Sequence, residues 1–522
     1  MVATYKNAFE GTVITNQGGE AYEVDALKKF QRFLILGTEG GTFYASEQKL
    51  TLDHMQNVRN VIDQYGVKAV DMIVKVSEGG RAPKNDPALA ALAVAASAES
   101  VETRRYAFEV LPRVARTPTH LFHFVEYVTK MRGWGKQLRR GIANWYLQKD
   151  NDQLAYQVSK YVQRDGWSNA DLLRLSHPMT FDETKNKIFR WVVDGYVSYH
   201  EDDRALDYLY AVERVKVETD IAKIVQLIQD YNLPREVLPT PALNNPEVWE
   251  ALLEKMPTQA MLRNLGVMSS VGLLNPFSDS QRKVVERLQK HGSLRRIHPL
   301  DILKAKMVFE AGHGVKSDKT WDVNQAIIDT LEDSFYASFG EIEPTYKRLL
   351  LALDVSGSMQ YGEYGNQNWL GIPNFSPRIA AAVLAMVTAR TEPDFHIMAF
   401  SNRFIRLNIS RHDSLETVMK KTGYLPSGGT DCALPMEYAR KNKLDVDAFI
   451  VYTDSETGGF NPMGALKLYR NDRKIKDAKL IVNAMVSSYY SIADPSDPNT
   501  LDCVGFDTAT PMVMSDFIRG EI

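Results

Sequence analysis

The sequence predicts a multidomain protein, with an all-α array of helical repeats followed by a doubly wound α/β domain. The chain has 522 residues, more than a single hydrophobic core usually serves. From about residue 50 to residue 345, one amphipathic helical segment follows another. After residue 346, continuous apolar strands alternate with helices, which is typical of a parallel sheet covered on both faces. We therefore expect domains at residues 1–345 and 346–522.

In the first domain, apolar residues recur at positions i, i+3, i+4 and i+7, and the short connections contain Gly, Pro, Asn or Thr. Leu138, Ile142 and Trp145 form one such apolar stripe. The expected helices include residues 88–97, 101–114, 121–131, 135–147, 151–164 and 171–175. Many short helices in series, with no strand between them, predict stacked helical pairs of the HEAT type, although the sequence shows no fixed repeat period. The glycine-rich residues 36–42 lack the ending of a phosphate loop and predict a turn.

In the second domain, the expected strands are residues 348–353, 395–400, 448–452 and 480–485, with helices at 378–390, 414–421 and 434–440. Ligands of such sheets gather outside the carboxyl ends of the strands. Three polar segments stand at these ends or in a loop before a helix, and they carry Asp354, Ser356, Ser358, Thr430 and Asp454.

These five side chains supply the hard oxygen ligands that suit a six-coordinate Mg²⁺ or Mn²⁺, with Mg²⁺ preferred here. An Asp-x-Ser-x-Ser motif alone is equally typical of a capped turn between a strand and a helix. With Thr430 and Asp454 following in order, the segment resembles a von Willebrand factor A domain and its metal-ion-dependent adhesion site. This set predicts metal binding and not catalysis, because no His or Lys base stands beside it in the sequence.

Composition and charge exclude several other classes of protein. The two cysteines lack the spacing of a zinc or redox site, and no apolar run approaches 18 residues, so we expect a soluble cytoplasmic protein without membrane contact.

The net charge is −3, yet residues 104–190 contain 16 Lys and Arg against 8 Asp and Glu. A basic region in an otherwise acidic chain predicts a local phosphate-binding surface, although solvated helix faces would give the same charge pattern.

The basic side chains of this region recur at helical spacing. Lys136, Arg139 and Arg140 should share one helix face, separate from the apolar stripe, and Arg132 precedes them. Lys160 and Arg164, four residues apart, should share another face. Gly166 is expected to end that helix, and Ser168 and Asp171 to form a capping-box-like start of the next. The tryptophans of the region, Trp134, Trp145 and Trp167, are interpreted first as core residues.

The stretch from Arg164 to Pro178, together with residues 36–42 and 119–125, resembles the Ro autoantigen, or TROVE-domain, family. The resemblance covers nearly the whole chain, because this family joins a ring of helical repeats to a C-terminal von Willebrand A domain. The resemblance implies a closed helical toroid whose two ends are fastened by the A domain. It implies that single-stranded 3′ ends of misfolded RNA enter the hole and that small Y-like RNAs bind the outer surface. Residues matching the family's RNA contacts are Lys160, Arg164 and His177. A role in RNA quality control, with a 3′ exoribonuclease as protein partner, is implied as well.

Two other functions remain open from the sequence. The protein could be a scaffold in which the A domain binds an acidic partner through its metal, or an RNA-processing enzyme. The enzyme is disfavoured because the basic region has no paired carboxylates and no nucleophile–base signature. We therefore expect a monomeric, non-enzymatic protein that binds RNA and not DNA, with Lys160 and Arg164 lying along a path that an RNA strand can follow.

Overall fold

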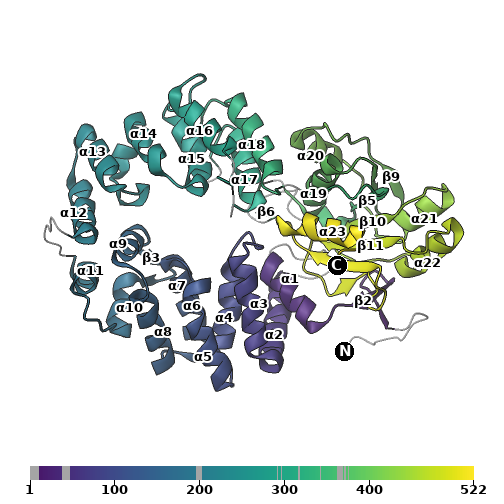
Figure 1. The fold of residues 1–522 in the computed structure, drawn as a ribbon, viewed down its shortest axis with the longest axis horizontal. Coiled ribbons are helices and arrows are strands. Elements are labelled where there is room, and N and C mark those ends of the chain that lie inside the picture. Colours follow the sequence, from purple (N-terminus) through teal and green to yellow (C-terminus); the bar gives the residue numbers. More distant parts are fainter. Residues whose placement is uncertain are drawn as a thin grey trace.

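The computed structural model describes residues 11–37, 47–195, 203–290, 292–294, 297–314, 318–340, 342–360, 368–369, 372–373 and 375–522. Most of the glycine-rich segment for which a turn was predicted, residues 38–42, lies outside the described residues. The helices of the first part follow one another along an arc, and the C-terminal α/β domain lies between the two ends of the arc, so that the elements surround a central opening (Figure 1). The predicted fold class is confirmed.

The arc is built from α1 (Ala26–Leu36), α2 (Glu47–Tyr65), α3 (Val67–Glu78), α4 (Asp86–Ser97), α5 (Val101–Glu109), α6 (Leu111–Val114), α7 (Pro118–Arg132), α8 (Lys136–Leu147), α9 (Asn151–Lys160), α10 (Asn169–Ser176), α11 (Glu183–Asp194), α12 (Arg204–Val217), α13 (Ile221–Tyr231), α14 (Pro246–Lys255), α15 (Thr258–Ser270), α16 (Asp279–Gln289), α17 (Pro299–Glu310) and α18 (Gln325–Ala337). Short 3₁₀ turns, η1 (Arg235–Val237) and η2 (Thr240–Asn244), lie between α13 and α14. Several helices begin at a capping side chain, such as Thr117 for α7 and Asp150 for α9, which accepts a hydrogen bond from a backbone N–H three residues on.

The helix predicted over residues 101–114 is two helices, α5 and α6, which meet at Val110. Pro112 lies near the start of α6, and a proline has no N–H for a helical hydrogen bond and disfavours helical backbone in the residue before it. The chain therefore breaks and begins a new helix at this point.

The helix predicted over residues 151–164 ends at Lys160, and its last part is instead a hairpin of β3 (Gln163–Arg164) and β4 (Trp167–Ser168). Asp165 and Gly166 have φ of 53° and 80°, the positive values that a two-residue hairpin turn needs. The Asp-Gly pair thus turns the chain back rather than ending a helix. The predicted cap is present, because Ser168 and Asp171 form a reciprocal capping box at the start of α10.

The C-terminal domain has a six-stranded sheet in the order β13-β11-β10-β5-β8-β9, parallel except for the edge strand β9. Its elements are β5 (Leu349–Asp354), η3 (Gly357–Gln360), β6 (Asn368–Trp369), β7 (Ile372–Pro373), α19 (Pro377–Thr391), β8 (Phe395–Phe400), β9 (Phe404–Arg406), α20 (Leu415–Gly423), α21 (Leu434–Lys441), β10 (Ala448–Thr453), α22 (Pro462–Arg473), β11 (Lys479–Ala484), β12 (Tyr490–Ser491), β13 (Thr500–Val504) and α23 (Ala509–Arg519). Alternate side chains of β5 enter different cores, since Leu351 packs with α19 and Leu350 packs with α21 and α22. The sheet is therefore covered on both faces, as predicted.

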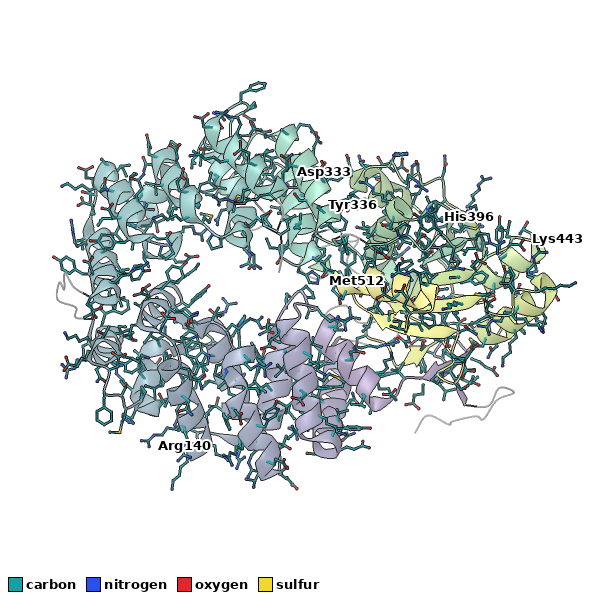
Figure 2. All side chains as sticks on the ribbon, in the orientation of Figure 1. Arg140, Asp333, Tyr336, His396, Lys443 and Met512 are labelled. Atoms are coloured by element: carbon teal, nitrogen blue, oxygen red, sulfur yellow. The ribbon has the colours of Figure 1, made fainter. Side chains whose placement is uncertain are left out.

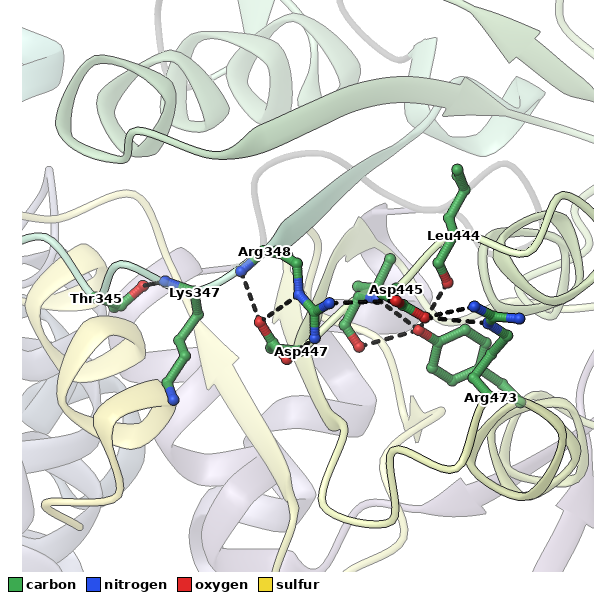
Figure 3. A network of polar contacts seen from close by, with 9 residues as sticks. Thr345, Lys347, Arg348, Leu444, Asp445, Asp447 and Arg473 are labelled. Carbon is green, nitrogen blue, oxygen red and sulfur yellow. Dashed lines mark hydrogen bonds and ion pairs between the residues drawn. The ribbon is translucent and has the colours of Figure 1, made fainter.

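An ion-pair network joins the beginnings of β5 and β10, at the edge of the sheet opposite the strands' carboxyl ends (Figure 3). The guanidinium of Arg348 donates to both oxygens of Asp447, at 2.9 and 2.6 Å, and Asp445 lies between Arg348 and Arg473. The hydrogen bond from Arg348 holds the pKa of Asp447 below its ordinary value. The network aligns the first residues of two neighbouring strands and is separate from the predicted metal site.

The first residues of the described chain belong to the C-terminal domain in space. β1 (Thr12–Ile14) and β2 (Glu20–Glu23) form a hairpin, and β2 pairs with β12 in a three-stranded sheet. The sequence did not predict these strands. At the other end of the arc, α18 contacts the same domain, because Arg390 of α19 lies 3.6 Å from the ring centroid of Tyr336. No described helix is long and apolar enough to span a membrane.

Candidate functional site

The five predicted metal ligands lie in one buried group at the carboxyl ends of β5 and β10. Asp354 ends β5, and its Oδ1 accepts a hydrogen bond from the backbone N–H of Ser356 at 2.9 Å. The hydroxyls of Ser356 and Ser358 are 3.1 Å apart, and Ser358 hydrogen bonds to Asp454. The loop with Thr430 is joined to this group where the N–H of Gly357 donates to the carbonyl of Gly428.

The two carboxylates of this group are buried without a compensating cation. Asp354 and Asp454 are both fully buried, and neither makes an ion pair with any described Lys, Arg or His. Burial, and then the neighbouring charge of Asp454, raises the pKa of Asp354 to about 7. Burial also raises the pKa of Asp454, whose Oδ2 has no hydrogen-bond partner among the described residues.

A buried carboxylate oxygen without a partner costs free energy unless a cation or a donor meets it. The possible ligands are two carboxylates and three hydroxyls. Such hard oxygen ligands suit Mg²⁺, whereas softer metal ions prefer sulfur or nitrogen ligands. The residues present therefore fit a hard divalent ion. Thr453 adds an outer hydrogen bond, because its hydroxyl donates to Oδ2 of Asp354 at 2.6 Å and helps to orient that carboxylate.

Two further residues at this site were not found from the sequence. Gln17, in the turn between β1 and β2, makes hydrogen bonds to both the backbone N–H and the hydroxyl of Thr430. Glu456 is buried just after Asp454, and burial and the charge of Asp454 raise its pKa to about 7. No local pattern in residues 12–23 predicts a contact with the loop that carries Thr430, more than 400 residues later in the sequence.

The basic face predicted on α8 is present. Lys136, Arg139 and Arg140 are exposed, whereas Leu138 and Trp145 are buried. Figure 2 shows Arg140 on the side of the ring that faces away from the central opening. Arg132, at the end of α7, is exposed too, and none of Arg132, Lys136 and Arg140 makes an ion pair with a described residue. These cations are therefore not neutralised by a described acidic side chain, and Arg140 among them lies on the outer side of the ring.

Arg139 links this face to His177. Its Nε lies 3.4 Å from the carbonyl of Ser176, the last residue of α10. His177 follows in left-handed backbone (φ 45°, ψ 61°) with an exposed imidazole that makes no hydrogen bond to any described residue. His177 also lines a groove of about 560 Å³ between α10 and α11, together with Arg174 and Arg190.

The prediction that Lys160 and Arg164 share one helix face is wrong, because the chain leaves the helix between them. Lys160 ends α9, with its Nζ 3.1 Å from the hydroxyl of Tyr156 and 5.5 Å from the ring centroid of Tyr161. Burial alone would lower the pKa of Lys160, but the hydrogen bond to Tyr156 and the charges of Tyr156, Tyr161 and Glu236 together outweigh burial and raise it. In Figure 1, α9 borders the central opening.

Arg164 projects from the hairpin instead. Its side chain is 63% exposed, and its only described ion-pair partner is Asp165, at 3.8 Å. It is opposite Trp167 in the hairpin register, and Trp167 stacks on Trp134 with ring centroids 5.9 Å apart. Trp145 is a core residue as predicted, but Trp134 and Trp167 are only partly buried. Neither Lys160 nor Arg164 forms a buried ion pair with a described acidic side chain.

Comparison with known protein families identifies the chain. The profile of the TROVE domain matches residues 13–311, and that of the Ro60 von Willebrand A domain matches residues 348–518. This chain belongs to the TROVE-domain family. It is 42% identical over 520 residues to the RNA-binding protein RO60 of Deinococcus radiodurans, covering 98% of this chain and 96% of that protein. It is 34% identical to the RNA-binding protein RO60 of Caenorhabditis elegans, covering 98% of this chain and 91% of the relative.

A solved structure of the family matches the fold over nearly all of this chain. The crystal structure of the Ro (Rsr) protein of Deinococcus radiodurans superposes with a TM-score of 0.72 at 42% identity, covering 95% of this chain and all of that one. The resemblance seen in the sequence is thereby confirmed. The boundary at residue 346 and the roles of the individual site residues stay predictions.

Proposed function

We propose that this protein is a non-enzymatic RNA-binding protein of the Ro type. The observation that carries the proposal is the group of exposed cations without a described ion-pair partner at the end of α7 and on α8, with Arg140 on the outer side of the ring (Figure 2). Such cations make sequence-tolerant contacts with phosphates. The names of the two curated relatives, both RNA-binding proteins RO60, support the same function.

We propose two modes of RNA binding on this ring. A small structured RNA of the Y type would bind the outer side, where Lys136, Arg139 and Arg140 are exposed and His177 can stack on an unpaired base. The single-stranded 3′ end of a misfolded RNA would enter the central opening, which α9 borders. Retaining such RNAs would place the protein in RNA quality control, with a 3′ exoribonuclease as the enzyme that acts on them.

The proposal is tested by binding measurements with labelled RNAs at several salt concentrations. We expect binding of a structured RNA with a single-stranded 3′ end, affinity that falls steeply as salt rises, and weaker binding of DNA of the same sequence. Binding that does not change with salt would contradict phosphate contacts. Incubation of the labelled RNA with the protein and Mg²⁺ should leave the RNA intact, and shortened products would contradict the non-enzymatic assignment.

We further propose that Asp354, Ser356, Ser358, Thr430 and Asp454 hold a divalent ion, Mg²⁺ by preference and Mn²⁺ as an alternative. The support is the pair of buried carboxylates, with one oxygen of Asp454 lacking any described partner. Calorimetric titration with Mg²⁺, or electron paramagnetic resonance with Mn²⁺, tests it. A single bound ion is expected, and no binding by the folded protein would refute the site.

A further inference from the structure

The turn between β1 and β2 packs directly on the loops that carry the predicted metal ligands. The backbone N–H of Gly19 donates to the carbonyl of Thr457 at 2.9 Å, and the hydroxyl of Thr15 donates to the same carbonyl. Thr457 lies three residues after Asp454, in the loop that follows β10. The N-terminal turn, residues 15–19, therefore contacts the loop that carries Asp454 directly.

Gln17 binds Thr430 through both ends of its amide. Nε2 donates to Oγ1 of Thr430 at 2.8 Å, and Oε1 accepts from the backbone N–H of Thr430 at 2.8 Å. Thr430 is only 3% exposed as a result. A hydroxyl has two acceptor positions, so the hydrogen bond from Gln17 leaves one of them for a cation. The contact thus orients Thr430 without using up its capacity as a ligand.

Asn16 makes two hydrogen bonds to Glu456, in the loop that follows β10. Its side-chain amide donates to Oε1 of Glu456 at 2.7 Å, and its backbone N–H donates to Oε2 at 3.2 Å. The N–H of Glu456 in turn donates to Oδ1 of Asp454 at 3.0 Å. Through these bonds the N-terminal turn fixes the loop that begins with a predicted metal ligand.

The fit between the turn and the loops leaves no room for another ligand between them. A Cβ atom added to Gly19 would lie 2.3 Å from the carbonyl oxygen of Thr457, which is closer than any real contact. A Cβ added to Gly458 would lie 3.0 Å from the carbonyl oxygen of Gln17. Glycine at both positions permits this close approach of the two backbones.

We propose that residues 15–19 are a built-in ligand of the metal-site face, with Gln17 positioning Thr430, so that ion binding and N-terminal docking strengthen each other. The inference rests on the proposed metal site. Coupling between two binding events is reciprocal, so an ion that orders Thr430 and Asp454 must also favour the docked turn by the same factor.

The test uses the full-length protein and two readouts. The first is the dissociation constant for Mg²⁺ of wild type, Gln17→Ala and the control Glu20→Gln. Glu20 lies in the same hairpin but accepts its hydrogen bond from Asn461, which stands directly before α22, at the end of the loop away from Asp454 and Glu456. We expect Gln17→Ala to weaken ion binding at least about fivefold and Glu20→Gln to leave it unchanged. The second readout is hydrogen exchange of residues 12–23, which Mg²⁺ should slow in wild type.

The outcomes separate this inference from the metal site itself. If wild type binds no ion, the metal site is refuted and this inference falls with it. If wild type binds an ion but Gln17→Ala binds it equally well, only the inference is overturned. Faster exchange of residues 12–23 in the presence of Mg²⁺ would also overturn it, because the ion would then compete with the turn.

Discussion

Arg32 of α1 and Asp502 of β13 form an ion pair in which Nη2 alone donates to both carboxylate oxygens, at 3.1 and 2.9 Å. Arg32 is fully buried, and its Nη1 also donates to the carbonyls of Ser488 and Tyr490. One side chain thus joins the first helix of the arc to two strands near the end of the chain. Both terminal nitrogens of this buried guanidinium are hydrogen-bonded, and these contacts favour one docking geometry of α1.

Arg32→Ala should strongly destabilise the closed ring. The change leaves Asp502 and two carbonyls without their donor, and removing one partner of a buried pair costs about 3–5 kcal/mol. Thermal unfolding and limited proteolysis at α1 measure the effect. The control is Lys29→Ala on the same helix, whose partner Glu23 is exposed and which should cost less than about 1 kcal/mol. Equal effects of the two variants would contradict the assigned role of Arg32.

Lys160→Ala combined with Arg164→Ala should weaken RNA binding by about 1–2 kcal/mol and flatten its dependence on salt. Both cations would be lost from phosphate contacts, although they lie on different elements. Titration of labelled RNA at several salt concentrations measures both effects. The control is Arg282→Ala with Lys283→Ala on α16, where both cations are already in exposed ion pairs. An unchanged affinity in the first variant would show that the contacts lie elsewhere on the ring.

Asp354→Ala should abolish ion binding and spare the binding of RNA to the outer side of the ring. The predicted ligand lies in the C-terminal domain, whereas the basic face lies on α7 and α8. Calorimetry with Mg²⁺ and RNA titration on the same preparation provide the two measurements. Loss of both activities in a folded variant would mean that the ion is needed for the ring to hold RNA.

Ion affinity should decrease as the pH is lowered through about 7. The pKa of Asp354 is raised to about 7, so its carboxyl takes up a proton at lower pH, and that proton competes with the ion. Between pH 8 and pH 6 the dissociation constant for Mg²⁺ should therefore increase about tenfold, the factor that competition by one such proton gives. Calorimetric titration at three pH values checks this, and a constant affinity would show that Asp354 is not a ligand.

Gly166→Ala should destabilise the hairpin that carries Arg164 by about 1 kcal/mol. An added Cβ would meet no atom within 4 Å, so the cost comes only from the positive φ of 80°. Gly166→Asn should cost less, because asparagine tolerates this backbone conformation better than alanine does. Hydrogen exchange at residues 161–168 measures the difference between the two variants. Identical exchange in both would mean that the turn adopts another conformation in solution.

The sequence predicts best what depends on local pattern. β5, β8, β10 and β11 were placed within one or two residues, because continuous apolar runs leave few alternatives for a buried strand. The hairpin at Asp165 and Gly166 was missed although its signal was present, since Asp-Gly is a strong two-residue turn signal that the helical spacing of Lys160 and Arg164 obscured.

The features that could not be predicted depend on contacts between distant parts of the chain. The strands β1, β2 and β12 are each too short to show a detectable periodicity in the sequence. β2 pairs with β12 although the two strands lie near opposite ends of the sequence, so no local pattern indicates the pairing. The five candidate metal ligands could be predicted from the sequence because each stands at a predicted strand end or in a loop beside one, and their role as ligands stays a prediction. Gln17 could not be found, because its role arises only when the N-terminal turn meets Thr430.

The pairing of β2 with β12, and of Arg32 with Asp502, has a consequence for how the protein is made. Arg32 and Asp502 are separated by 470 residues, so α1 leaves the ribosome long before its partner has been synthesised. At about 5–20 residues per second, this interval lasts roughly 25 to 90 seconds. Until Asp502 has been synthesised, α1 lacks this partner, so the contact that joins α1 to β13 can form only late in translation.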